Sequence, residues 1–128
     1  MIKIEHIAIW VKDLEIMKNF YCKYFEASSN QKYINSTKKF ESYFLSFSSG
    51  PRLELMTRID IKGLDVKPEQ YGFTHIAIKL GENNKVDELT NKLRNDGFEV
   101  VGEPRMTGDG YYESVILDPE NNRIEITA

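Results

Sequence analysis

The first apolar residues of the chain alternate with polar or small ones, which is the pattern of a β-strand. Over residues 2–11, Ile7 and Ile9 fall on one side while His6 and Trp10 fall on the other, because successive strand side chains point to opposite faces of a sheet. The aliphatic row is suited to a core. The pattern therefore predicts that His6 and Trp10 line the opposite face.

A helical period follows this strand. From Leu14 to about Phe25, apolar residues recur three or four positions apart, and Asp13 is a good N-cap for the segment. Many of these residues are aromatic, so the segment has two interpretations: a binding surface, or a helix that packs on a sheet. Packing on a sheet is the prediction, because an apolar stripe at helical spacing is the ordinary composition of a buried helix face.

Turn signals divide the rest of the chain into short strands and one more helix. The first half continues with a loop or weak strand at 28–39, strands at 39–48 and 52–57, and a linker at 60–72. The second half has strands at 73–80, 98–101, 111–117 and 123–127, a helix at 85–96 that ends at Gly97, a loop at 104–110 and a turn at 118–122. The order β-α-β-β-β therefore occurs twice.

The sequence itself also repeats. The tetrapeptide His-Ile-Ala-Ile stands at residues 6–9 and again at 75–78. Arg-Leu-Glu-Leu at 52–55 is answered by Arg-Ile-Glu-Ile at 123–126. Repetition at nearly the same offset indicates that the two halves are copies of one structural module.

Each half thus contributes one His and one Glu from corresponding strands, namely His6, Glu54, His75 and Glu125. Their strand neighbours are mostly aliphatic, so each lies on the face opposite the core, where a Glu must be solvated, paired or bound to a metal. Two imidazoles and two carboxylates suit a divalent transition metal such as Zn, Ni, Co, Fe or Mn. Positions remain for water or substrate if coordination expands beyond four.

A plainer interpretation applies to any one of these residues. Exposed strand faces often carry Glu, and a single strand His is more often structural than a metal ligand. A solvated face, however, gives no reason for His and Glu to occupy equivalent points of both repeats. If both halves turn their polar faces inward, the four residues form one shared metal site, and this is the prediction.

Length and composition narrow the class of protein. At 128 residues the chain is expected to be one domain, with modules at about 1–60 and about 72–128 that fold onto each other. The net charge of −3 at pH 7 comes without a basic cluster that would indicate nucleic-acid binding. No apolar run is long enough to span a bilayer, no signal peptide is recognisable, and Cys22 has no second cysteine to pair with. We expect a cytoplasmic protein that acts on a small molecule, without nucleic-acid or membrane partners.

With these motifs in view, the whole chain resembles the vicinal oxygen chelate superfamily, also called the glyoxalase/bleomycin-resistance/dioxygenase superfamily. The resemblance is carried by residues 6–9, by Asp13 and the following helix with Phe20 and Tyr21 towards its end, and by residues 53–55, 75–78 and 118–126. The last segment is similar to the family signature Asp-Pro-x-Gly-Asn-x-Ile-Glu. Asn121 replaces the usual Gly, and Asn tolerates a left-handed turn conformation.

The resemblance implies an α+β fold in which two βαβββ modules form an open, curved, eight-stranded mixed sheet around one divalent transition metal. It implies metal ligands at His6, Glu54, His75 and Glu125. Ring-cleaving dioxygenases and fosfomycin-modifying members generally use three protein ligands, and methylmalonyl-CoA epimerases usually have Gln at the second position. Glu54 therefore favours a site of the glyoxalase I (lactoylglutathione lyase) type.

Such a site implies a metal-dependent lyase or isomerase that converts the hemithioacetal of an α-oxoaldehyde and a thiol to a 2-hydroxyacyl thioester, a detoxification reaction. Glu125, with Glu54 as its counterpart, is expected to move the proton between adjacent carbons. Two alternatives stay open. One is another metal-dependent enzyme of the superfamily, an epimerase or thiol transferase. The other is a non-catalytic binding protein of the bleomycin-resistance type, whose members commonly lack the metal ligands.

The resemblance does not extend to the substrate pocket. Bacterial glyoxalase I enzymes generally have a basic residue near the position of Trp10 that helps to bind glutathione, whereas Trp10 is flat and apolar. Candidate pocket residues are Trp10, Met56, Arg52 and Arg123, although the two arginines are more readily explained as surface residues. Superfamily members often dimerise, so we expect a homodimer, with the site formed within one chain or across two.

Overall fold

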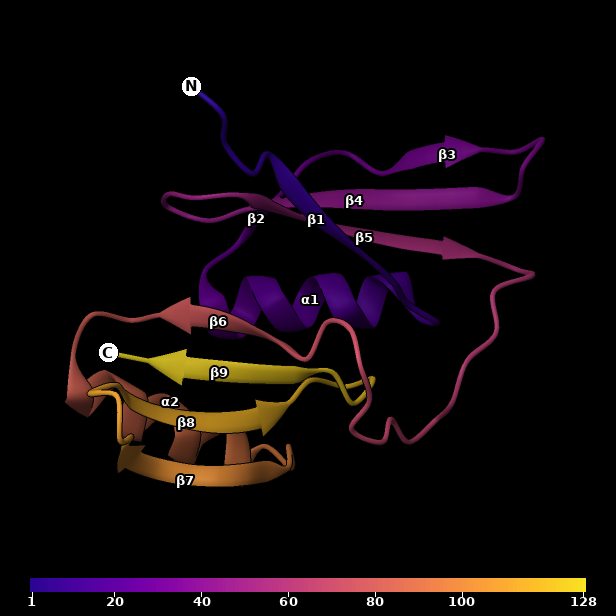
Figure 1. Cartoon of the computed structure of the whole chain (residues 1–128). Helices are drawn as coiled ribbons and strands as arrows, with labels where there is room; N and C mark the ends of the chain where they lie inside the picture. Colours follow the sequence, from indigo (N-terminus) through magenta and orange to yellow (C-terminus); the bar gives the residue numbers. More distant parts are fainter. The chain divides into compact units, whose positions relative to one another are not determined.

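The computed structural model describes residues 1–128. The chain divides into two compact units, Met1–Gly63 and Leu64–Ala128, which we call module one and module two. Each module contains one α-helix and one open mixed sheet (Figure 1). This arrangement confirms the predicted α+β class and the repeated β-α-β-β-β order.

Module one contains a five-stranded sheet. Its elements are β1 (His6–Trp10), α1 (Leu14–Phe25), β2 (Ser28–Ser29), β3 (Tyr33–Asn35), β4 (Phe40–Ser46) and β5 (Arg52–Arg58). The strand order is β1-β5-β4-β2, and β3 also pairs with β4. The polar segment expected to be a loop or weak strand therefore forms two short strands, which is why the protein has nine strands and not the predicted eight.

Module two contains a four-stranded sheet. Its elements are β6 (His75–Lys79), α2 (Asn83–Asn95), β7 (Val100–Met106), β8 (Tyr112–Leu117) and β9 (Arg123–Thr127). The strand order is β6-β9-β8-β7, which matches the order of the main strands of module one. In both modules the first strand runs parallel to the last strand, and the other pairs are antiparallel.

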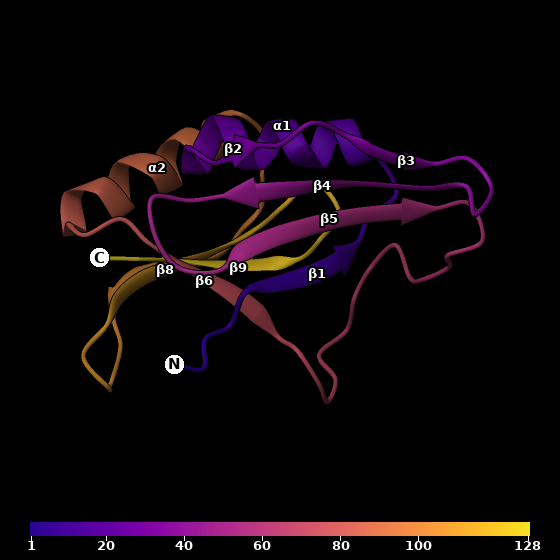
Figure 2. The same cartoon turned by 90° about the horizontal axis from the view of Figure 1, so that it is seen from above.

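Helix α1 begins where the sequence predicts. The Asp13 carboxylate accepts a hydrogen bond from the Ile16 amide at 3.0 Å, and the helix ends at Glu26, which adopts a left-handed conformation with φ 56°. Helix α1 lies alongside β4 in Figure 2, and its aromatic stripe is buried against β4 and β5, so the packing interpretation is confirmed. The buried residues are Leu14, Met17, Phe20, Tyr21, Tyr24 and Phe25.

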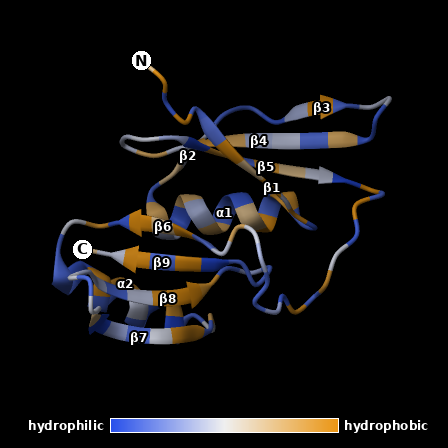
Figure 3. Ribbon diagram, in the orientation of Figure 1, coloured by the Kyte–Doolittle hydropathy of each residue, from blue (hydrophilic) through white to orange (hydrophobic).

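Helix α2 has a narrower buried face, formed by Val86, Thr90 and Leu93. Figure 3 shows hydrophilic and hydrophobic positions mixed along this helix, as expected for an element with one buried side. The Thr90 and Ser114 hydroxyls lie 2.7 Å apart between α2 and β8, so this core contains a satisfied polar contact. Gly97 follows the helix at φ 95°, a conformation that favours glycine and ends the helix as predicted.

The first strand is shorter than predicted. It begins at His6 and not at residue 2, and the row expected to be core is largely exposed at Ile7 and half-buried at Ile9. The reason is that β1 is an edge strand, while α1 packs on the neighbouring strands β4 and β5. The same holds for β6, whose Ile76 and Ile78 are half-buried at the edge of the second sheet.

The predicted loop at 104–110 is wrong in its first part, because β7 continues to Met106. Pro104 lies inside this strand, which is tolerated because β7 is an edge strand and its pairing with β8 contains irregularities on both sides of Gly102. In the whole structure, neither helix is long and apolar enough to cross a membrane.

Candidate metal centre

In module one, His6 and Glu54 lie side by side on one face of the sheet. The parallel register of β1 and β5 pairs His6 with Arg52 and Ala8 with Glu54, so Glu54 lies two residues along β5 from the register partner of His6. This offset brings His6 Nε2 to 3.6 Å from Glu54 Oε1. The sequence prediction that these two side chains share a face is confirmed.

Module two repeats this arrangement in the same register. Ala77 pairs with Glu125 and His75 pairs with Arg123. His75 Nε2 lies 3.2 Å from Glu125 Oε2. The repeated tetrapeptides are therefore a repeat in three dimensions, and each module presents one imidazole and one carboxylate in the same way.

The distances within each pair fit two ligands of one metal ion. Donor atoms about 2.1 Å from a metal lie about 3.0 Å apart at octahedral angles and about 3.4 Å apart at tetrahedral angles. The observed 3.6 and 3.2 Å are close to these values. The histidine side chains are 39% and 38% exposed and the glutamates 14% and 23%, so the donors are accessible without being fully solvated.

Each module provides two donors and no more. No group of three or more His, Cys, Asp or Glu side chains is spaced to hold a metal ion. A divalent transition metal binds four or more ligands. One His–Glu pair is therefore half of a ligand set.

The Glu5 carboxylate, which the alternation of the sequence did not indicate, contacts the His6 ring. Glu5 hydrogen-bonds to His6 Nδ1 and also pairs with the Arg52 guanidinium. The hydrogen bond with His6, and then that with Arg52, lower the pKa of the Glu5 carboxyl. Metal-binding histidines typically have such a carboxylate on the second ring nitrogen, because it fixes the tautomer that leaves Nε2 available.

Strict alternation concealed this role of Glu5. An extended strand from residue 2 would point Glu5 and His6 to opposite faces. The strand instead begins at His6, and Glu5 lies in the irregular segment before it. An acidic residue directly before a candidate ligand is the signal that could have identified it.

The surroundings of the module-one pair are aromatic. Phe44 packs edge-on against His6 with ring centroids 5.2 Å apart, and the Arg52 guanidinium lies 4.1 Å from the Phe44 centroid. Trp10 pairs in register with Met56, on the same face as His6. Three predicted pocket residues, Trp10, Met56 and Arg52, thus lie on the face that carries the His–Glu pair.

The surroundings of the module-two pair are charged. Glu113 is buried two positions along β8 from Val115, the register partner of Glu125. Burial, and then the charge and hydrogen bond of Glu125, raise the pKa of the Glu113 carboxyl, while the Arg105 charge opposes this shift. Arg123, the fourth predicted pocket residue, lies beside His75 in register and its guanidinium is 3.4 Å from Glu69 Oε1.

The fold and the repeated His–Glu pairs define an α+β protein made of two βαβββ modules, each with one imidazole and one carboxylate side by side on its sheet. The family model of the Glyoxalase/Bleomycin resistance protein/Dioxygenase superfamily matches residues 3–126. The chain therefore belongs to this superfamily, as the resemblance of its motifs predicts.

Individual relatives are distant. The chain is 25% identical over 130 residues to the uncharacterized protein YqjT of Bacillus subtilis (strain 168), and the match covers 96% of both chains. Among solved structures, glyoxalase I of Zea mays superposes with a TM-score of 0.80 at 22% identity, over 98% of this chain but only 44% of the maize chain. The trypanothione-dependent glyoxalase I of Leishmania major gives a TM-score of 0.78 at 22% identity, over 99% of this chain and 86% of that enzyme. At these identities the structural matches show a common fold.

Proposed function

We propose that the protein is a metal-dependent lyase or isomerase of the glyoxalase I type. One divalent transition metal (Ni, Zn, Co, Mn or Fe) would be held by His6, Glu54, His75 and Glu125. The observation that carries this proposal is the recurrence of the His–Glu pair in both modules, in one register and at a ligand-like spacing. Because each module supplies half of a ligand set, two modules must cooperate, either both from one chain or one from each chain of a homodimer.

The proposed reaction is the isomerisation of a hemithioacetal to a 2-hydroxyacyl thioester. When bound, the metal supplies Lewis-acid stabilisation of negative charge on the two adjacent substrate oxygens. Glu125 takes the proton from the carbon that bears sulfur and returns it to the neighbouring carbon, while the hydroxyl proton passes to the oxygen of that neighbour. No atom is gained or lost. General-base help of this kind accelerates a reaction by about 10²–10⁴-fold.

Glu54 has the position in module one that Glu125 has in module two. Glu54 stands to His6 as Glu125 stands to His75, so it is the natural counterpart for proton transfer at the other face of the substrate. Trp10, Met56, Arg52 and Arg123 would form the substrate pocket. The protein would be a cytoplasmic detoxification enzyme for a reactive small molecule.

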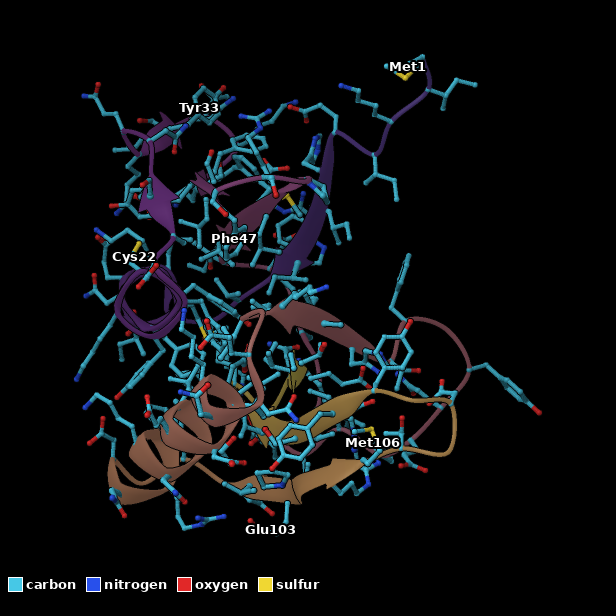
Figure 4. The ribbon with its side chains drawn as sticks, turned by 90° about the vertical axis from the view of Figure 1, so that its left-hand side faces the viewer. Met1, Cys22, Tyr33, Phe47, Glu103 and Met106 are labelled. Atoms are coloured by element: carbon cyan, nitrogen blue, oxygen red, sulfur yellow. The ribbon has the colours of Figure 1, made fainter.

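Elemental analysis of the purified protein tests the metal centre. We expect about one transition metal per chain, lost in His6→Ala and in Glu54→Ala. Glu103→Ala is the matched control. Glu103 is exposed on the edge strand β7 (Figure 4), which β8 separates from β9, and it pairs with Arg94 of α2.

Activity would then be measured on hemithioacetals of several thiols, with and without a chelator. Metal-dependent turnover supports the glyoxalase type, and metal binding without turnover on any hemithioacetal supports an epimerase or thiol transferase. Absence of metal uptake when Ni, Co, Zn or Mn is supplied would refute the enzyme proposal and favour a small-molecule-binding protein.

A further inference from the structure

Beyond the His–Glu pair, the same face of module one is covered with aromatic and apolar side chains. Met56 follows Glu54 by two residues on β5 and pairs with Trp10 on one side. Phe44 pairs with Glu54, and Phe40 pairs with Arg58. Residues two apart on a strand share a face, so Phe44, Trp10, Met56 and Phe40 form one surface, which we call the aromatic strip.

The aromatic strip is continuous with the His–Glu pair. Phe44 contacts the His6 ring at 5.2 Å, Trp10 contacts Phe40 with centroids 6.2 Å apart, and Phe40 contacts Tyr33 at 6.1 Å. From Glu54 to Arg58 the strand advances about 13 Å. A ligand bound at the pair would therefore have a row of rings beside it, ending near Tyr33, which Figure 4 labels in module one.

Trp10 is the accessible part of this strip. Its side chain is 40% exposed although it contacts Phe40 and the Arg58 guanidinium, whose carbon lies 5.2 Å from the indole centroid. Exposed apolar surface of this kind, next to polar groups that converge, is typical of a ligand site. An indole binds flat rings by stacking, at centroid separations of about 4.5–7 Å.

The charges on this face argue against an anionic ligand tail. Arg52 already pairs with Glu5, and Arg58 pairs with Asp60 at 2.5 Å. Both guanidiniums near the strip are thus neutralised by carboxylates of the same module. An apolar tail gains from the rings without having to displace either ion pair.

Module two does not repeat the strip at three of its four positions. The residues that correspond to Trp10, Met56 and Phe44 are Lys79, Thr127 and Val115. The aromatic surface is therefore not a requirement of the βαβββ module, since the second copy folds without it.

We infer that the part of the ligand that does not chelate the metal is a flat aromatic group, which stacks on Trp10 and packs against Met56. The inference rests on the proposed function, because it takes the ligand to be held at the His–Glu pairs by two adjacent oxygens. It narrows the substrate class from hemithioacetals in general to those with an aromatic substituent.

Two small acids test the inference. Lactate and mandelate are 2-hydroxy acids with the same pair of adjacent oxygens, and they differ by a methyl in place of a phenyl group. Their affinities for the Zn²⁺-loaded protein are measured by calorimetry. Quenching of tryptophan fluorescence gives a second readout, which reports on Trp10 alone because the chain has one tryptophan. We expect mandelate to bind at least about 10-fold tighter than lactate, from burial of the ring and stacking on the indole.

Variants locate the effect. Trp10→Lys and Met56→Thr introduce the residues that module two has at these positions, so they are compatible with the strand, and each should reduce the mandelate-to-lactate ratio several-fold. Lys79→Ala on module two is the control and should leave the ratio unchanged. Equal affinities in the Zn²⁺-loaded wild-type protein, or a ratio that survives both variants, would overturn the inference and leave the proposed function standing. If the protein does not bind Zn²⁺, the same comparison is made with Ni²⁺, Co²⁺ or Mn²⁺, and failure to bind any of these metals would refute the proposed function and the inference with it.

Discussion

The two modules agree at the His–Glu pair and differ around it. In both, the Glu lies two residues beyond the register partner of the His on a parallel strand. Beside this pair, module one has Phe44 where module two has Val115, and module one has Ser42 where module two has the buried Glu113. The residues that the modules share are the two residue types of the proposed metal ligands. The residues in which they differ give module one an apolar surface beside its pair and module two a charged one.

The two helices also differ, both in the size of the face that they bury and in their N-caps. Helix α1 buries a wide aromatic face and has a side-chain cap at Asp13, whereas α2 buries three residues and Glu82 at its N-cap makes no side-chain cap hydrogen bond. Both helices still cover the face of the sheet opposite the His–Glu pair. The module thus tolerates large changes of packing provided that the strand register is kept.

The largest expected effect comes from changing one glutamate at a time. Glu125→Gln keeps an oxygen donor but removes the base, so kcat for hemithioacetal isomerisation should fall by about 10²–10⁴-fold, with metal retained. Glu54→Gln is the matched variant, and unequal losses would show which module holds the main base. Full activity with full metal content in Glu125→Gln would eliminate its role in proton transfer.

The contact between Glu5 and His6 exists in module one alone, since Thr74 precedes His75. Glu5→Ala should weaken metal affinity by about 10–100-fold, because loss of a carboxylate behind a ligating histidine frees its ring. Thr74→Ala should change the affinity little. Competition with a metal-sensitive dye measures both variants, and equal affinities for Glu5→Ala and wild type would show that Glu5 does not orient the ligand.

The helix caps offer a comparison of stability. Asp13→Ala removes the hydrogen bond to the Ile16 amide and should lower the free energy of unfolding by about 1 kcal/mol. Glu82→Ala should have a smaller effect, because its side chain makes no such bond. Urea denaturation monitored by circular dichroism separates the two, and similar losses would contradict the difference between the helices.

The smallest expected effect is a change in the pH dependence of folding stability, caused by the Glu113 carboxyl. Because its pKa is raised in the folded protein, the folded state favours the protonated form. The stability that this proton provides is present below the ordinary glutamate pKa and is lost as pH rises through the raised value. Glu113→Gln cannot ionise, so it should gain stability relative to wild type as pH rises from about 4 to 8.

Metal-free protein is used for this measurement, since Glu113 interacts with Glu125, a proposed ligand. Ser42→Ala, at the corresponding position of module one, is the control and should show a constant difference from wild type. A pH-independent difference for Glu113→Gln would mean that its carboxyl is not perturbed in solution.

Local patterns were sufficient to predict the elements that depend on near neighbours in the chain. Asp13 and the apolar period after it predicted α1 to the residue, and Gly97 predicted the end of α2. The repeated tetrapeptides predicted two equivalent modules, and alternation put His6 and Glu54 on one face. These features follow from side-chain direction and capping, which operate over a few residues.

Tertiary structure decided the features that depend on which strand lies at an edge. The exposure of Ile7, the entry of Pro104 into a strand and the approach of Glu5 to His6 all occur on edge strands or just before them. Sequence alternation is the same for an edge strand and a central strand, whereas burial depends on the helix that packs on each. The His–Glu pairs were therefore predictable from the sequence. The contact of Glu5 with His6 and the aromatic strip beside this pair could be recognised only once the register of distant strands was known.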